Sequence, residues 1–234
     1  MNKRLKVTLM AIIAFILVLT AGFFIYVSNY YRAEAVALAV MKNETGLSVH
    51  DDYIVLLPST PSDTALIFYP GGKVEHLAYL PMMEKITAQT GITTILVKMP
   101  FNLAVFGANK ADQVIEQFPD ITDWYIGGHS LGGAMASDYA SKNQTKVDGL
   151  ILMGAYIYGD YPAENALTIF GTLETDVADQ IDYTENVVAI DGGNHAQFGH
   201  YGKQKGDPDA TISRDQQQKI TVEAIDQFLV NREN

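Results

Sequence analysis

The sequence predicts an α/β fold, in which a mostly parallel central sheet carries helices on both faces and is preceded by one apolar helix. Short apolar runs alternate along the chain with segments whose apolar residues recur at helical spacing. This alternation is typical of strands joined by helical crossovers. The run 65–69 is apolar throughout, as expected of a strand buried on both faces. With 234 residues, the chain is long enough for one domain with a large core.

The predicted elements follow one another in a regular order. Strands are expected at residues 53–57, 65–69, 93–97, 124–126, 149–153, 167–170 and 187–190. Helices are expected at residues 31–41, 76–90, 111–118 and 211–230, and directly after the strand 124–126. Turns or loops are expected at residues 42–46, 58–63 and 100–109. The sequence shows no internal repeat and no second domain.

Residues 7–27 form an almost unbroken apolar run. As a helix, this run would be roughly 30 Å long, about the thickness of a bilayer core. Lys3, Arg4 and Lys6 precede it, and positive charge in this position stays on the cytoplasmic side. The run therefore predicts a single transmembrane helix that anchors the chain in the cell membrane, with the rest of the chain outside the cytoplasm.

A cleaved signal peptide is the alternative interpretation of this segment. Ala33-Glu34-Ala35 resembles the small-residue site at which signal peptides are cut, and cleavage there would make the protein secreted. We favour the anchor because the apolar run is longer than the roughly 7–15 residues of a signal peptide. The expected organisation is an anchor over 1–30, a linker over 31–47 and a globular catalytic domain over 48–234.

Composition and charge exclude several classes of function. The net charge is −11, and Lys3, Arg4 and Lys6 contribute three positive charges, so the remaining chain carries −14. A body this acidic would repel the phosphates of nucleic acid. The chain has no cysteine, which excludes disulfides and thiolate metal sites. We see no metal-ligand cluster and no G-x-G-x-x-G pattern, and we therefore expect no metal and no cofactor.

Residues 124–133 combine a strand end, a glycine-flanked turn and a helix start. The apolar residues 124–126 precede Gly128-His129-Ser130-Leu131-Gly132, which matches G-x-S-x-G. In this context the pattern predicts a nucleophile elbow, in which Ser130 lies in a strained turn with its hydroxyl exposed. The two glycines leave room where the strand and the helix approach each other. The N–H of Leu131 would face a developing oxyanion.

Two later strands are expected to deliver the partners of Ser130, because ligands bind at the carboxyl ends of parallel strands. The strand 187–190 leads into Asp191-Gly192-Gly193-Asn194-His195. We predict His195 as the general base that takes the proton of Ser130. The alternative is His200, but Gly192 and Gly193 would let the chain bend back over the nucleophile at His195.

The acid of the predicted triad is expected after the strand 167–170. Glu174 and Asp176 both follow the end of this strand, and the chain order Ser, acid, His is the one found with such an elbow. We favour Glu174 because it is nearer the strand, and Asp176 is the alternative. The carboxylate that is not used would be an ordinary charge at the N-terminus of a helix.

An oxyanion hole needs a second N–H donor besides that of Leu131. This donor is expected in the loop after the strand 65–69. Pro70-Gly71-Gly72-Lys73 fits, because glycines let backbone amides face a ligand. We predict Gly72 as the donor, with Lys73 as the alternative.

Three motifs together resemble a bacterial α/β-hydrolase family of the alpha/beta hydrolase fold-5 type. They are Phe68-Tyr69-Pro70-Gly71-Gly72-Lys73-Val74, Gly128-His129-Ser130-Leu131-Gly132-Gly133 and Gly192-Gly193-Asn194-His195-Ala196-Gln197-Phe198-Gly199. The resemblance covers roughly Tyr53 to the C-terminus. It implies a serine hydrolase of the α/β-hydrolase fold with Ser130 as nucleophile and His195 as base. Such families usually carry Asp at the acid position, where this chain has Glu174.

The expected function is an extracytoplasmic, membrane-anchored serine esterase that cleaves a carboxylic ester or a related acyl bond of a small molecule. Two alternatives remain. One is a binding protein on an inactive hydrolase fold, and the other is an acyltransferase or peptidase that uses the same triad. Little chain lies between Ser130 and Glu174 for a large lid, so we expect an open site. The sequence does not predict the substrate or the oligomeric state.

Overall fold

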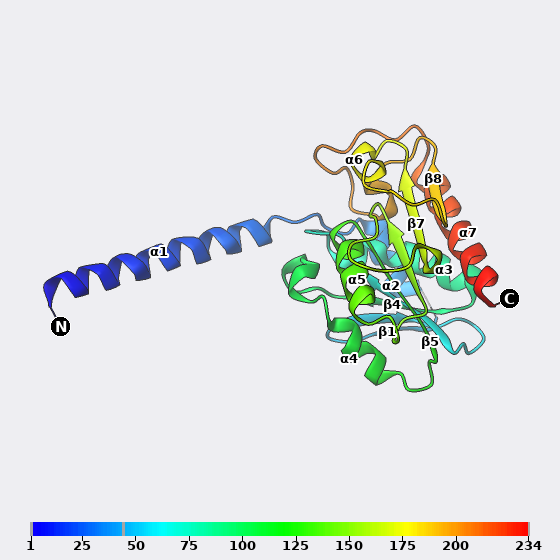
Figure 1. Ribbon diagram of the computed structural model, residues 1–234, viewed down its shortest axis with the longest axis horizontal. Coiled ribbons are helices and arrows are strands. Elements are labelled where there is room, and N and C mark those ends of the chain that lie inside the picture. The colour runs from blue at the N-terminus through cyan, green and yellow to red at the C-terminus, as the bar shows by residue number, and fades with distance from the viewer. Residues whose placement is uncertain (1, 44, 234) are drawn as a thin grey trace. The chain divides into compact units, whose positions relative to one another are not determined.

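The structure is a computed structural model that describes residues 2–43 and 45–233 (Figure 1). The chain divides into two compact units, residues 1–30 and residues 31–234. The first unit is the helix α1 (Lys3–Ser28), whose N-terminus is capped by the side chain of Asn2, which accepts the Arg4 N–H at 2.8 Å. This helix has a mean hydropathy of 2.6 and is long and apolar enough to be a membrane span or a signal sequence.

The second unit is built on an eight-stranded sheet in the described residues. The strands are β1 (Leu47–Val49), β2 (Tyr53–Leu56), β3 (Thr64–Tyr69), β4 (Thr93–Val97), β5 (Asp123–His129), β6 (Gly149–Met153), β7 (Ala166–Gly171) and β8 (Val187–Ile190). Their order in the sheet is β1-β2-β4-β3-β5-β6-β7-β8. β1 and β2 are antiparallel to their neighbours, and the strands from β4 to β8 run parallel. The sheet is therefore mostly parallel, as predicted.

Helices cover both faces of the sheet. They are α2 (Ala35–Asn43), α3 (Leu80–Thr90), α4 (Lys110–Gln117), α5 (Leu131–Lys142), α6 (Thr175–Ala178) and α7 (Arg214–Glu233). In β3, Leu66 and Phe68 belong to the core cluster that includes α2, α3 and α7, whereas Ile67 and Tyr69 belong to the cluster that includes α4 and α5. Successive side chains of a strand point to opposite faces, so this apolar strand fills two cores at once. Figure 1 shows α7, in red, beside β7 and β8.

The described part of the segment 31–47, for which the sequence predicts a linker, lies in the second unit. It contains α2 and β1, and Ala37 and Val40 of α2 are buried. The predicted helix over 31–41 starts only at Ala35, because the backbone of Tyr31 pairs with the chain around Val74 instead. One residue of the predicted turn over 42–46, residue 44, lies outside the described residues.

The loops at the carboxyl ends of the parallel strands lie along one edge of the sheet. In the register, His129 of β5 pairs with Met153 of β6, Met153 pairs with Ile169 of β7, and Gly171 of β7 pairs with Ile190 of β8. The loops that leave these strands therefore start side by side. This edge is where an open α/β sheet places its ligand site.

Candidate active site

Ser130 lies in the sharp turn between β5 and α5. Its backbone has a φ of 53° and a ψ of −124°, a conformation that costs energy in any residue other than glycine. A Cβ atom added to Gly128 would lie 2.5 Å from the backbone carbon of Gly132 and 2.7 Å from the carbonyl oxygen of Tyr69. The strand and the helix can approach this closely only because both flanking residues are glycines. The local geometry is that of a nucleophile elbow.

Glu174 and His195 form a buried pair between the ends of β7 and β8. Oε1 of Glu174 lies 2.5 Å from Nδ1 of His195, and Oε2 accepts the Gly171 N–H at 2.6 Å. The side chains of Glu174 and His195 are only 3% and 16% exposed. Because a carboxylate accepts hydrogen bonds, Nδ1 carries the proton and Nε2 of His195 is left as an acceptor.

The other carboxylate of this loop, Asp176, lies in the first turn of α6 and is exposed. The structure therefore brings Glu174, and not Asp176, to His195. Glu174 folds back because its N–H donates to the Gly171 carbonyl at 2.9 Å in a tight turn. That turn directs the carboxylate under the end of β7, whereas the chain after it turns outward into the short helix.

His195 lies over the elbow. The ring of His129, the residue directly before Ser130, has its centre 4.4 Å from the centre of the His195 ring. His129 itself is completely buried, and its Nδ1 lies 2.7 Å from the hydroxyl of Tyr79, which accepts the Gly71 N–H. The Tyr79 hydroxyl and Nδ1 of His129 therefore share a hydrogen bond. Burial and the neighbouring His195 hold the pKa of His129 well below its usual range, so it stays neutral.

The glycine loop after β3 touches the residues on both sides of Ser130. A Cβ on Gly71 would lie 2.8 Å from Nδ1 of His129, and a Cβ on Gly72 would lie 2.9 Å from Cδ2 of Leu131. The Lys73 N–H is already used, because it donates to the Asn102 carbonyl at 2.7 Å. Among the described residues, no hydrogen bond is made by the N–H of Gly72 or by that of Leu131, the first residue of α5. The geometry favours Gly72 over Lys73 as the second donor.

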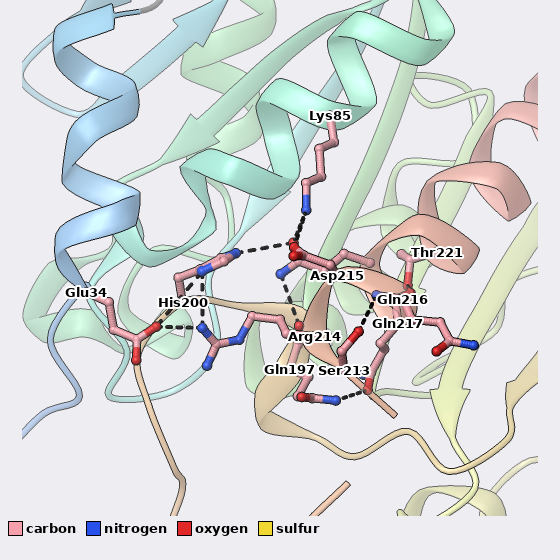
Figure 2. Close-up of polar contacts among 11 residues, drawn as sticks. Glu34, Lys85, Gln197, His200, Ser213, Arg214, Asp215, Gln216, Gln217 and Thr221 are labelled. Atoms are coloured by element: carbon pink, nitrogen blue, oxygen red, sulfur yellow. Dashed lines mark hydrogen bonds and ion pairs between the residues drawn. The ribbon is translucent and has the colours of Figure 1, made fainter. Parts of the chain in front are cut away.

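The alternative base, His200, has both ring nitrogens engaged away from the elbow. Its Nε2 lies 3.2 Å from Oε1 of Gln218. Its Nδ1 lies 3.1 Å from Nη1 of Arg214 (Figure 2). Burial, and then the Arg214 guanidinium, lower the pKa of His200. A neutral histidine with both nitrogens occupied has no free position with which to accept a proton from Ser130.

A match to a known family agrees with this geometry. The alpha/beta hydrolase family matches residues 65–219, which is more than half of the chain. The chain belongs to the alpha/beta hydrolase family. No curated protein sequence matches this family member. The resemblance stated from the three sequence motifs is confirmed.

Several solved structures share the fold of this chain at low sequence identity. Est1E from Butyrivibrio proteoclasticus has a TM-score of 0.56 and 14% identity, and the match covers 80% of this chain and 99% of that one. A monoacylglycerol lipase from Paleococcus ferrophilus has a TM-score of 0.55 and 12% identity over 79% of this chain and 100% of that one. Carboxyl esterase 2 from Tuber melanosporum has a TM-score of 0.54 and 12% identity over 75% and 81%. The predicted α/β-hydrolase fold is thereby confirmed.

Three residues that contact the His195 loop or the Glu174–His195 pair are not predicted by any motif in the sequence. Asp207 accepts the N–H of His195 at 3.1 Å and that of Ala196 at 2.8 Å through its two carboxylate oxygens. Gln217 of α7, which is fully buried, accepts the Asn194 N–H at 3.1 Å and donates to the Asn194 carbonyl at 2.7 Å. These side chains hold the loop by its backbone, and no sequence pattern marks a residue for that task.

The third such residue is Gly154, which follows β6. It has a φ of 53°, and a Cβ on it would lie 2.7 Å from Oε1 of Glu174 and 2.9 Å from Nδ1 of His195. Glycine is therefore needed here both for the backbone and for the room taken up by the acid and the histidine. Among the described residues, no group of three or more His, Asp or Glu side chains could hold a metal ion.

Proposed function

We propose that this protein is a membrane-anchored serine hydrolase that cleaves a carboxylic ester of a small molecule. Ser130 is the nucleophile, His195 the general base and Glu174 the acid of the triad. The observation that carries the proposal is the buried Glu174–His195 pair placed over the elbow that holds Ser130. A buried carboxylate, an imidazole and a serine in a strained turn form the constellation of acyl-transfer chemistry.

The reaction begins with proton transfer from the Ser130 hydroxyl to Nε2 of His195 as Oγ attacks the ester carbonyl carbon. The carbonyl oxygen becomes an oxyanion, which accepts hydrogen bonds from the N–H groups of Gly72 and Leu131. Glu174 stabilises the imidazolium and keeps its ring in place. The imidazolium then gives its proton to the departing alkoxide, so an alcohol leaves and an acyl group remains on Ser130.

Water completes the cycle by the same route. His195 takes a proton from water, the resulting hydroxide attacks the acyl carbon, and the Ser130–acyl bond breaks as the proton returns to Oγ. The products are a carboxylic acid and free enzyme. An acyltransferase would differ only in using an alcohol or amine in place of water. Two of the structural relatives named above, the carboxyl esterase and the monoacylglycerol lipase, cleave esters by their names, which supports ester cleavage.

The direct test is labelling of the full chain with a fluorophosphonate probe, followed by rates on p-nitrophenyl esters of increasing acyl length. We expect stoichiometric labelling of Ser130 and hydrolysis that depends on chain length. Omitting or adding an acceptor alcohol then separates hydrolysis from acyl transfer. Labelling that persists in Ser130→Ala would show that Ser130 is not the nucleophile. A parent protein that neither reacts with the probe nor hydrolyses esters would instead support the alternative of an inactive binding protein.

We further propose that α1 spans the cell membrane and leaves the catalytic domain outside the cytoplasm. The supporting features are the length and mean hydropathy of the helix and the basic residues Lys3, Arg4 and Lys6 before it. Protease added to intact cells should remove the domain and leave a short membrane-bound fragment. Protection of the domain would reverse the orientation, and a free domain that begins near Ala35 would mean that the signal is cleaved.

A further inference from the structure

We propose that residues 31–34 are a positioning element of the active site, and that cutting the chain directly after them inactivates the enzyme. These four residues, which we call the N-terminal strap, have extended or irregular backbone and precede α2. They are hydrogen-bonded to the two loops that carry Gly72 and His195. The inference rests on the proposed function, because it concerns the same site.

The strap pairs first with the chain that directly follows Gly72. The Tyr31 N–H donates to the Lys73 carbonyl at 2.7 Å, and the Glu75 N–H donates to the Tyr31 carbonyl at 2.9 Å. The Ala33 N–H donates to Oε2 of Glu75 at 2.9 Å. These bonds make a short parallel bridge between Tyr31 and the glycine loop, so the strap fixes the backbone one residue from the proposed oxyanion donor.

The strap also binds the loop that follows His195. The Glu34 N–H donates to the His200 carbonyl at 2.8 Å, and Oε2 of Glu34 accepts a hydrogen bond from Nη1 of Arg214 at 2.6 Å. The same Arg214 nitrogen lies 3.1 Å from Nδ1 of His200. The Lys205 N–H donates to the hydroxyl of Tyr31 at 3.0 Å. Figure 2 shows Glu34, His200 and Arg214 together at one end of a polar network.

That network continues without a break to the residue before His195. Oε1 of Gln218 accepts from Nε2 of His200, and Nε2 of Gln218 donates to the Gln197 carbonyl at 3.1 Å. The Gln197 side chain donates to Oε1 of Gln217 at 3.1 Å, and Gln217 holds both backbone groups of Asn194. Figure 2 follows this path from Glu34 towards Gln197 and Gln217. Gln217 and Gln218 are fully buried, so the path is shielded from water over most of its length.

Positioning, more than stability, is the expected role of these contacts. Glu34 and Arg214 have side chains that are 38% and 26% exposed, so their ion pair is screened by solvent and contributes at most about 1 kcal/mol to folding. The rate is far more sensitive, because a displacement of about 1 Å at a reacting group can cost on the order of 100-fold. The strap joins the loop of the oxyanion donor to the loop of the base, and both must be in place at once.

The strap also bears on processing of the chain. The candidate signal-cleavage site Ala33-Glu34-Ala35 lies within and directly after it. Cleavage after Ala35 would separate the catalytic domain from Tyr31, Ala33 and Glu34, and with them from every hydrogen bond described for the strap. A domain released in this way would lose activity, so the active form keeps the strap.

The first experiment compares full-chain variants at Glu34. Glu34→Ala removes the acceptor for Arg214, and we expect kcat per fluorophosphonate-labelled site to fall about 10-fold with KM little changed. Glu34→Gln keeps a side-chain oxygen for Arg214 and should restore most of the rate. Glu223→Ala is the matched control, because Glu223 pairs with Lys219 on the exposed side of α7, and both side chains are largely exposed. A purely structural role would reduce the number of labelled sites but not kcat per site, and that result would overturn the proposal.

The second experiment cuts the chain on either side of the strap. A protease recognition sequence is inserted in the full chain between Asn29 and Tyr30, or after Ala35, and each protein is assayed before and after cutting. We expect the first cut to leave kcat unchanged and the second to reduce it at least 10-fold. Equal activity of the two cut forms would overturn the proposal. Absence of ester hydrolysis in the uncut chains would contradict the proposed function instead, so the two failures are distinguishable.

Discussion

Glu174 binds the Nδ1 position of His195 with one carboxylate oxygen, at 2.5 Å, and the backbone N–H of Gly171 with the other, at 2.6 Å. The carboxylate thus ties the histidine to the end of β7. With both oxygens occupied and its side chain 3% exposed, Glu174 is fixed in one orientation. In the proposed mechanism, Glu174 would therefore hold the His195 ring and balance the positive charge that would form on it.

Neutralising Glu174 should separate its role from that of Asp176. We expect Glu174→Gln to lower kcat on the order of 10⁴-fold, because the imidazolium loses its counter-charge and the ring its orientation. Asp176→Asn, in the exposed first turn of α6, should change kcat little and stability within about 0.5 kcal/mol. Steady-state rates on a p-nitrophenyl ester measure both. The reverse pattern would assign the role of triad acid to Asp176. Nearly normal rates in both variants would mean that the triad acid follows another strand.

Removal of the Ser130 hydroxyl should abolish both labelling and turnover. We expect Ser130→Ala to lower kcat on the order of 10⁶-fold if the triad acts as a unit. Ser141→Ala, at the far end of α5, serves as the control and should label and turn over normally. Mass spectrometry of the labelled peptide locates the probe. A probe found on any residue other than Ser130 would disprove the assignment.

Gly154 should tolerate no side chain, because a Cβ there would meet Glu174 and His195. Gly91→Ala is the matched control, since Gly91 also has a positive φ, of 72°, but has nothing within 4 Å of an added Cβ. Both changes should cost about 1–2 kcal/mol of backbone strain, measured by denaturant unfolding. Only Gly154→Ala should lower kcat substantially. Equal kcat in the two variants would mean that the pair adapts to the added methyl group.

Gln217→Leu should weaken the hold on the His195 loop. It leaves the buried N–H and carbonyl of Asn194 without the partners that they have now, at a cost of about 1–3 kcal/mol for each unsatisfied group. We expect a lower unfolding free energy and a lower kcat per labelled site. Gln216→Leu changes the neighbouring exposed residue and should lower neither the unfolding free energy nor kcat per labelled site. A stable Gln217→Leu protein with normal kcat would exclude Gln217 as a positioning residue.

The stability of the domain should fall with acidification in part through His76. Burial, and then the Lys98 ammonium, lower the pKa of His76 to about 4, against about 6.5 in an unfolded chain. Between these values the unfolded state binds the proton and the folded state does not. The contribution of His76 is therefore complete above about pH 6.5 and is lost as the pH falls towards 4, with a slope of at most about 1.4 kcal/mol per pH unit.

The variant His76→Asn isolates this effect. Urea unfolding of the full chain in detergent between pH 7 and pH 4 should give a shallower loss of unfolding free energy than in the parent protein. Parallel curves for the two proteins would show that His76 is protonated as easily in the folded state as in the unfolded one.

The sequence by itself determined the fold class and the place of the nucleophile elbow that holds Ser130, the proposed nucleophile. Alternating apolar runs and helical periods depend only on local residue order, and so does the glycine-flanked turn at Ser130. The structure has a strand at each of the seven predicted places. Within the described residues it adds β1, a three-residue edge strand that is too short to give a pattern. The family could also be predicted from the sequence, because each of the three motifs is a run of consecutive residues.

Tertiary structure alone decided which residues meet. Glu174 and Asp176 are two residues apart with the same chemistry, and only the turn at Gly171 directs the first of them to His195. Likewise, Gly72 and Lys73 differ as donors only because a distant carbonyl, that of Asn102, occupies the Lys73 N–H.

The N-terminal strap is a further feature that local sequence patterns do not predict, because its partners are far away in the chain. The sequence predicts a helix from residue 31, because the segment is rich in alanine and local propensity favours a helix there. The backbone of Tyr31 instead pairs with Lys73 and Glu75, some forty residues away. Hydrogen bonds between segments far apart in the chain override local propensity when both partners are held by a packed sheet, and no local pattern records them.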